Sequence, residues 1–388
     1  MKITDIQIFG VGGIEAVELK FNEQMNLICG PNGIGKTTIL ETIAHTFSTG
    51  ETSVLKRNVN CNRSKVTSTV FDGEKSQKVT IQFDTFIPEK RAQINGLYLL
   101  SEKMFSFKTT RTFNYSPLQS VSKDSDKSVH NTYQEAVLGI NLADIKNWFV
   151  NRYLYSAHPG TLTSEQISNF ELAKRCFSLL NPSFSFSKVD ASSNEIMVNT
   201  PSGEIYYEYL SSGFKSILSL SFGIIKEIEY RFKSPRIKAV DFDGIITIDE
   251  IELHLHPEWQ GKIANILSDL FPNVQFFATT HSPHIIQASK PNQIIALEVI
   301  GNKVVQRHLP ETKYGFQGWT VEEVLTDVMG MSDTRTALFN NLLNDFGEHI
   351  DNGNYSKAND VFNKIDIILH PQNHLRKLLK FQLAEIKG

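Results

Sequence analysis

Hydrophobic residues along this chain recur in the two rhythms that mark strands and helices. The apolar run Met25–Cys29 predicts a short strand, and the segment Lys36–Phe47 places apolar side chains three and four positions apart, which predicts a helix with one buried face. Two β-type runs, Val66–Phe71 and Lys78–Phe83, flank Asp72-Gly73 and predict a hairpin. The first part of the chain therefore combines strands with helices.

The second half alternates strands and helices more regularly. Strands that alternate with helices favour an α/β fold, in which helices flank a mixed sheet. The predicted elements are a helix over about Phe214–Phe232, a strand over Ile245–Ile248, a helix after Pro257, a strand over Val274–Ala278, and β-type runs over Gln293–Ile300 and Lys303–His308.

The pattern changes in the middle of the chain and again near its end. Ser101–Asn131 is rich in Ser, Thr, Asn and Lys and has weak periodicity, so we expect a loop there. We expect a core domain over residues 1–310 with a helical insertion at about 86–200, and a helical C-terminal appendage over 311–388. The amphipathic segments that predict the appendage helices are Val321–Met329, Thr334–Ile350, Ser356–Leu369 and Asn373–Ile386.

Composition narrows the class of protein. Hydrophobic residues make up 40% of the 388 positions and charged residues 21%, as in ordinary globular proteins. The net charge of −3 does not indicate a nucleic-acid binder, although a local basic groove stays compatible with it. The three cysteines show no disulfide framework and no metal motif, and no apolar stretch reaches the ~18 residues of a membrane span. We therefore expect a cytoplasmic protein.

A phosphate-binding loop follows the first apolar strand and fits the pattern G-x-x-x-x-G-K-[ST]. Glycines let the backbone wrap around phosphate groups, and the N–H groups at the following helix start attract anions. Lys36 adds a positive charge near the β- and γ-phosphates, and Thr37 supplies a hydroxyl to Mg²⁺. The sequence therefore predicts binding of ATP with Mg²⁺ by Gly30, Pro31, Asn32, Gly33, Ile34, Gly35, Lys36, Thr37 and Thr38.

A second acidic motif follows the strand Ile245–Ile248. Asp249 and Glu250 end this strand in the manner of a Walker B motif, so Asp249 is a candidate Mg²⁺ ligand and Glu250 a candidate to orient and polarise the attacking water. A solvated strand end is the commoner meaning of such a pair in isolation. The phosphate-binding loop upstream favours the catalytic interpretation.

Three further segments carry a resemblance to a known family. Leu210–Lys215 resembles the signature motif of ABC-type ATPases, Asp249–Pro257 resembles the DExExxLHP run of their RecF-like and OLD-like branches, and Thr280–Pro283 resembles the switch-histidine segment. The chain is thus similar to ABC-type P-loop ATPases of the RecF/OLD/SMC-like branch. Each segment also has a plainer interpretation: Ser211 as a helix cap, or His281 as an ordinary buried histidine.

The resemblance implies a head-to-tail homodimer, or a larger oligomer, with ATP held between two chains. Ser211, Ser212 and Gly213 would then touch the γ-phosphate of the partner's ATP, while His281 would contact it from its own chain. Lys36, Glu250 and His281 are the implied catalytic residues. No glutamine stands clearly at the loop that couples nucleotide to partner in this family; Gln119 and Gln134 are positional candidates only.

Within this branch, the chain resembles the ATPase subunit of Septu-type and retron-associated anti-phage systems, which controls a separate HNH endonuclease. The resemblance includes Thr320–Leu325 in the tail. Residues 310–388 are too few and too helical for a TOPRIM nuclease domain, so any cleavage should come from another chain. Alternatives are a RecF-like DNA-repair or DNA-clamp ATPase, a nucleotide-gated scaffold with little turnover, and a transporter ATPase subunit.

Two smaller features leave their interpretation open. His254 and His256 are spaced too weakly to predict a metal site without further ligands. The segment Ser101–Asn131 is mildly basic, which allows a DNA contact, although a solvated loop is the plainer explanation. Its basic residues are Lys103, Lys108, Arg111, Lys123 and Lys127.

Overall fold

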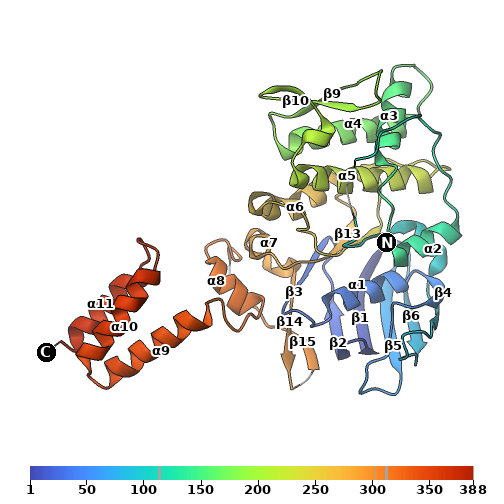
Figure 1. Ribbon diagram of the computed structural model, residues 1–388. Helices are drawn as coiled ribbons and strands as arrows, with labels where there is room; N and C mark the ends of the chain where they lie inside the picture. Colours follow the sequence, from blue (N-terminus) through green and yellow to red (C-terminus); the bar gives the residue numbers. More distant parts are fainter. Residues whose placement is uncertain (112–114, 302, 311–312, 388) are drawn as a thin grey trace. The chain divides into compact units, whose positions relative to one another are not determined.

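The computed structural model describes residues 1–111, 115–301, 303–310 and 313–387. They form two compact units, Met1–Gly330 and Met331–Gly388 (Figure 1). The first unit contains all the motifs singled out above.

The centre of the first unit is a six-stranded sheet in the order β15-β14-β3-β13-β12-β8, in which β14, β3, β13, β12 and β8 are parallel and β15 pairs antiparallel with β14. All residues of β3, β8, β12 and β13 are buried, because both faces of these strands are covered. Their sequences therefore lack the alternation of buried and exposed positions that a half-exposed strand shows. The strands are β3 (Met25–Cys29), β8 (Met104–Phe107), β12 (Ile245–Ile248), β13 (Gln275–Thr279), β14 (Ile294–Ile300) and β15 (Lys303–Gln306).

An antiparallel sheet in the order β2-β1-β5-β6 packs near the P-loop helix α1 (Lys36–His45), which also contacts β12 and β13 (Figure 1). The predicted hairpin is confirmed, because Val66 pairs with Ile81 across β5 and β6. A smaller ribbon pairs β4 with β7. The bounds are β1 (Lys2–Val11), β2 (Ile14–Lys20), β4 (Thr49–Thr52), β5 (Ser64–Phe71), β6 (Ser76–Phe83) and β7 (Ala92–Asn95).

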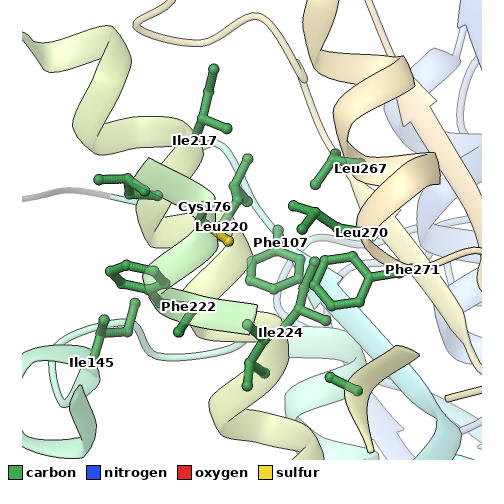
Figure 2. Close-up of a cluster of buried hydrophobic side chains, with 14 of the residues drawn as sticks. Phe107, Ile145, Cys176, Ile217, Leu220, Phe222, Ile224, Leu267, Leu270 and Phe271 are labelled. Atoms are coloured by element: carbon green, nitrogen blue, oxygen red, sulfur yellow. The ribbon is translucent and has the colours of Figure 1, made fainter. Parts of the chain in front are cut away.

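A helical layer with its own three-stranded sheet, β11-β10-β9, surrounds the long helix α5 (Figure 1). Figure 2 shows how Phe107 of β8 meets Leu220 of α5 and Phe271 beyond α6 in one apolar cluster. The elements are α2 (Val129–Leu138), α3 (Ile145–Ser156), α4 (Ser164–Leu180), β9 (Ser185–Val189), β10 (Ile196–Thr200), β11 (Gly203–Tyr206), α5 (Ser212–Arg231), α6 (Pro257–Leu270) and α7 (Pro283–Ala288), with short 3₁₀ turns at Tyr98–Lys103, Tyr207–Tyr209, Ala239–Asp241 and Pro291–Gln293.

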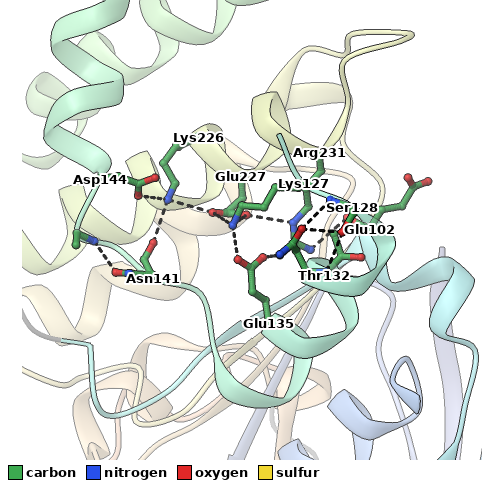
Figure 3. Close-up of polar contacts among 12 residues, drawn as sticks. Glu102, Lys127, Ser128, Thr132, Glu135, Asn141, Asp144, Lys226, Glu227 and Arg231 are labelled. Carbon is green, nitrogen blue, oxygen red and sulfur yellow. Dashed lines mark hydrogen bonds and ion pairs between the residues drawn. The ribbon is translucent and has the colours of Figure 1, made fainter. Parts of the chain in front are cut away.

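Buried charges fix α5 to the elements around it (Figure 3). Arg231 donates to the carbonyl oxygen of Met104 at 2.9 Å and to the carboxylate of Glu135 at 2.7 Å, so it joins α5 to β8 and α2. Lys226 pairs with Asp144 before α3. Because the side chains of Arg231 and Lys226 are almost fully buried, removing their acidic partners would leave an uncompensated buried charge, which is strongly destabilising.

The prediction of a loop over Ser101–Asn131 was wrong in part. Met104–Phe107 forms β8, an edge strand of the central sheet that pairs in parallel with Ile245–Ile248. Four residues are too few for a periodic signal, and long-range pairing decides their conformation. Residues 112–114 of the segment lie outside the described residues.

The C-terminal helices are distributed over both units. Val321–Glu323 (α8) and the π-helical turn Val324–Val328 pack inside the first unit, where Val324 and Val328 contact Ile286 and Phe316. The second unit is a set of helices around Phe346, Phe362 and Leu379, and all three of its predicted helices are present. These are α9 (Ala337–Asp351), α10 (Tyr355–Ile368) and α11 (Leu375–Glu385). None of the helices described is long and apolar enough to cross a membrane.

Candidate nucleotide-binding site

Four parallel strands bring the sequence motifs to one edge of the central sheet. β3 leads into the P-loop, β13 into Thr280–Pro283, β12 into Asp249 and β8 into Lys108. The carboxyl ends of parallel strands share an edge, which is where open α/β sheets bind ligands. Motifs from distant parts of the chain therefore converge without any special loop.

The P-loop backbone has the conformation that its glycines predict. Gly33 has a φ of +77° and Gly35 a φ of +104°, values that residues with a side chain rarely adopt. A Cβ atom at Gly35 would also lie 2.8 Å from the side chain of Ile14. α1 begins immediately afterwards at Lys36, so the free N–H groups of its first turn adjoin the loop. The loop can therefore cradle an anion with backbone groups.

Lys36 is buried at the base of this loop. Its Nζ donates hydrogen bonds to the carbonyl oxygens of Gly30 at 2.9 Å and Pro31 at 3.0 Å. Burial lowers the pKa of Lys36, while Glu252, Asp249 and other nearby groups act in the opposite direction. The ammonium group is thus held in place by the loop and lies in the field of the acidic residues after β12.

Thr37 and Asp249 form the part of the site suited to a divalent cation. The Thr37 hydroxyl lies 3.1 Å and 3.2 Å from the two carboxylate oxygens of Asp249, and Thr279 donates its hydroxyl to Asp249 at 2.6 Å. One hydroxyl and one carboxylate in contact are the hard oxygen donors that Mg²⁺ takes from protein beside phosphate oxygens and water. The donor set fits Mg²⁺, with the ion's remaining positions left to nucleotide and water.

Glu250 has an unusual backbone. Its φ of +50° lies in the left-handed region, a conformation that costs a non-glycine residue of order 1–3 kcal/mol and concentrates at functional sites. Its N–H donates to the Thr279 hydroxyl at 2.7 Å, and its carbonyl oxygen accepts from the Arg111 guanidinium. The turn after β12 is therefore held from β13 on one side and from the segment after β8 on the other.

His281 stands at the end of β13 with an exposed side chain. Its backbone N–H donates to the Glu252 carboxylate at 2.5 Å, and the other carboxylate oxygen of Glu252 is buried without a hydrogen-bond partner among the described residues. Ser282 caps α7 and donates to Gln260 at 2.6 Å. These contacts fix the backbone of His281 while leaving its imidazole free to reach a ligand.

The signature residues lie apart from the P-loop. Ser211 is the N-cap of α5 and accepts the N–H of Phe214 at 3.3 Å, so it does act as a helix cap. Ser211 and Ser212 are nevertheless exposed, and Gly213 packs against the backbone of His254–His256. No hydrogen bond within the described part of the chain joins these serines to the P-loop.

Other residues singled out from sequence have different surroundings. Gln119 lines a pocket with Tyr115 and Glu195, and Gln134 lines another with Thr49. Neither glutamine hydrogen-bonds the turn after β12 in the residues that the structure describes. His254 and His256 are exposed, and no group of three or more metal-ligating side chains occurs among the described residues.

Most of the basic residues considered for DNA have partners inside the protein. Lys103 pairs with Asp243 at 2.8 Å, and Lys108 pairs with Glu41 at 2.6 Å. Lys127 pairs with Glu135 and Arg111 is buried. In the part of the chain that the structure describes, four of the five are thus paired or buried and Lys123 is the exception, so a basic DNA-binding loop has little support.

Sequence reasoning missed three residues of the site: Arg111, Thr279 and Glu252. Glu252 stands within the acidic run but received no role. Thr279 ends a buried strand and has no motif of its own, and Arg111 belongs to a segment expected to be a loop. Their importance comes from strand pairing, which no local pattern records.

Comparison with known proteins identifies the family of this chain. Septu protein PtuA from Bacillus thuringiensis is 44% identical over 391 residues, which cover 99% of this chain and 98% of that protein. The chain belongs to the Septu PtuA family. The resemblance inferred from the motifs is thereby confirmed.

More distant matches of this Septu PtuA-family chain agree. The retron Ec83 probable ATPase from Escherichia coli is 36% identical over 104 residues, 27% of this chain and 19% of that protein. The family model described as AAA ATPase domain matches residues 163–286, and one described as AAA domain matches 5–175. The chain therefore carries an ATPase domain.

Among solved structures, the SMC head domain from Thermotoga maritima covers 80% of this chain and 100% of its own, at 14% identity and a TM-score of 0.46. The fold itself is defined by the strand order and the motif positions described above. It is an α/β P-loop fold in which helices flank a mixed sheet, as the sequence predicts.

Proposed function

We propose that this chain is the ATP-hydrolysing subunit of a Septu-type anti-phage system, and that its ATP-dependent head-to-tail dimer controls a separate nuclease. The observation that best supports the proposal is the division of the site. Lys36, Thr37 and Asp249 assemble within one chain, whereas Ser211 and Ser212 face solvent elsewhere. A second copy would bring its own signature residues to the nucleotide, which makes the dimer the active unit.

The residues have separate tasks in this proposal. Lys36 and the P-loop amides bind the phosphates, and Glu250 orients the attacking water and accepts its proton. His281 contacts the γ-phosphate from the same chain. Mg²⁺, held by Thr37 and Asp249, would neutralise charge that develops on the phosphate oxygens. ATP bound between two chains favours the dimer, and hydrolysis releases that preference, which is the condition for a switch.

A mixing experiment tests the composite site. Lys36→Ala removes phosphate binding but keeps the signature, whereas Ser212→Glu keeps the P-loop but places a negative charge where the partner's phosphate would bind. Ser212 is exposed in the first turn of α5, where an acidic side chain suits the helix, so the variant should fold.

Each variant alone should lack ATPase activity. In an equal mixture, about half of the dimers contain one chain of each variant. Each such heterodimer has one intact site, formed by the P-loop of the Ser212→Glu chain and the signature of the Lys36→Ala chain. About a quarter of wild-type activity should therefore return. An inactive mixture would argue against the head-to-tail dimer. Equal, near-zero rates for wild type and Glu250→Gln, with ATP binding intact, would instead favour the nucleotide-gated scaffold.

A further inference from the structure

The segment after β8 holds the turn that carries Glu250. β8 and β12 run in parallel with Phe107 opposite Ile248, and the N–H of Asp249 donates to the carbonyl oxygen of Phe107 at 2.9 Å. The pairing thus continues one residue past β12. Beyond this residue, the segment after β8 contacts the turn through the side chain of Arg111 instead of through backbone groups.

The Arg111 guanidinium reaches two successive carbonyl groups of this turn. One terminal nitrogen donates to the Asp249 carbonyl oxygen at 2.6 Å and to the Lys108 carbonyl oxygen at 3.0 Å, and the other donates to Glu250. Arg111 is only 6% exposed. Its planar fork can bridge two acceptors at fixed geometry, which the single ammonium of a lysine cannot reproduce.

Glu250 needs such support because its backbone is left-handed and reverses the chain at once. Its carbonyl oxygen also accepts the N–H of Leu253 at 2.9 Å, while the N–H of Ile251 donates to Thr279 at 3.0 Å. The turn is therefore defined by hydrogen bonds from three segments. Among the described residues, Arg111 is the one whose side chain donates to the carbonyl groups of both Asp249 and Glu250.

The Arg111 guanidinium is buried against the acidic residues Asp249 and Glu250. Its Nε is buried without a hydrogen-bond partner among the described residues. A buried cation with an unused donor is costly, which argues that the turn depends on it.

We infer that Arg111 is a positioning residue that fixes the Glu250 carboxylate for its task, through the two carbonyl groups of the turn after β12. This inference rests on the proposed ATPase function for its effect on turnover. Its effect on the turn itself holds without nucleotide and can be measured separately.

The test compares Arg111→Met, which keeps the stem and loses the donors, with Arg111→Lys, which keeps the charge. Amide hydrogen exchange of the nucleotide-free, full-length chain is followed in residues 249–255 and in α1. ATP affinity and kcat are measured beside it. Arg152→Lys is the matched control, because Arg152 is an equally buried arginine that pairs with Asp124 and Glu229.

We expect Arg111→Met to speed exchange in residues 249–255 about tenfold while α1 is unchanged, since the opening is local. Its kcat should fall about tenfold or more with ATP affinity kept within about threefold, and Arg111→Lys should lie between it and wild type. Arg152→Lys should change neither the exchange of residues 249–255 nor kcat selectively.

Unchanged exchange in residues 249–255 would overturn the inference, as would equal loosening of the whole chain or a parallel loss of affinity. If wild type proves not to hydrolyse ATP, the proposed function fails. Amide hydrogen exchange in residues 249–255 still tests the role of Arg111 in the turn in that case.

Discussion

The Thr37 hydroxyl lies 3.1 Å from a carboxylate oxygen of Asp249, although 212 positions separate the two residues. Thr37 belongs to the first turn of α1, and Asp249 ends β12 two strands away from β3 in the same sheet. The contact exists because parallel strands end at a common edge. It joins the phosphate-binding half of the site to the acidic half.

This contact predicts a selective effect of Thr37→Val, which keeps the shape of the side chain and removes its hydroxyl. Since Thr37 is exposed, the free energy of unfolding should barely change. ATP affinity in the presence of Mg²⁺ should fall about tenfold, because one oxygen ligand is lost, while affinity in EDTA stays the same. Calorimetric titration of both states checks this. Thr37→Ser, which keeps the hydroxyl, is the control, and equal behaviour of the two variants would refute the metal assignment.

The contact between Glu252 and the His281 backbone predicts that the two residues act as one unit. Removing the carboxylate in Glu252→Ala frees the His281 N–H, so kcat should fall about tenfold at nearly constant ATP affinity. His281→Ala should have a similar effect. If Glu252 works through His281, the double variant should be little worse than either single one, whereas additive losses would show independent roles.

His45 predicts a loss of stability in mild acid. Its Nδ1–H donates to the Glu41 carbonyl oxygen at 2.6 Å, its Nε2 accepts from Thr52 at 2.8 Å, and burial lowers its pKa to about 4 from 6.5. Between these two pKa values the imidazole is protonated in the unfolded chain but neutral in the folded chain. The stability that this difference provides is fully present above pH 6.5 and is lost as the pH falls toward 4. It amounts to at most about 3 kcal/mol in the free energy of unfolding.

Urea unfolding at pH 7.5 and at pH 5.0 measures the effect. His45→Gln should lower stability at pH 7.5 but reduce the difference between the two pH values, because the titrating group is gone. A difference as large as that of wild type would assign the acid sensitivity to other groups.

The amino-acid sequence predicts those parts of this molecule that are local. The P-loop is contiguous, so its residue types alone foretell its glycine conformations and the helix start at Lys36. The strand before Asp249 is equally local. Their proposed chemical roles stay predictions.

Other features depend on what lies beside a residue in space. β8 is four residues long, and only its pairing with β12 makes it a strand. Arg111 and Thr279 matter because β8 and β13 flank β12, an order that periodicity cannot supply. For the same reason, Val324 and Val328 pack with the first unit although their sequence reads like the helices that follow.

The division after Gly330 predicts that ATP binding and partner binding can be separated. The apolar clusters of the first unit draw on residues no later than Met329, and no candidate site residue lies in the second unit. A chain ending at Gly330 should therefore bind ATP within about twofold of the full chain, as expected for independent domains. If the second unit docks the proposed partner nuclease, this shortened chain should fail to co-purify with that nuclease.

A full-length variant provides the matched comparison for this truncation. Leu378 and Phe381 are exposed on α11, 60% and 71% respectively, whereas Leu379 and Leu383 form its buried face. Leu378→Lys with Phe381→Lys should keep the second unit folded, because substitutions at exposed positions rarely destabilise by more than about 0.5 kcal/mol. Reduced nuclease binding with unchanged ATP affinity would place the partner on this helix face, whereas retained binding by both variants would move the docking surface to the first unit.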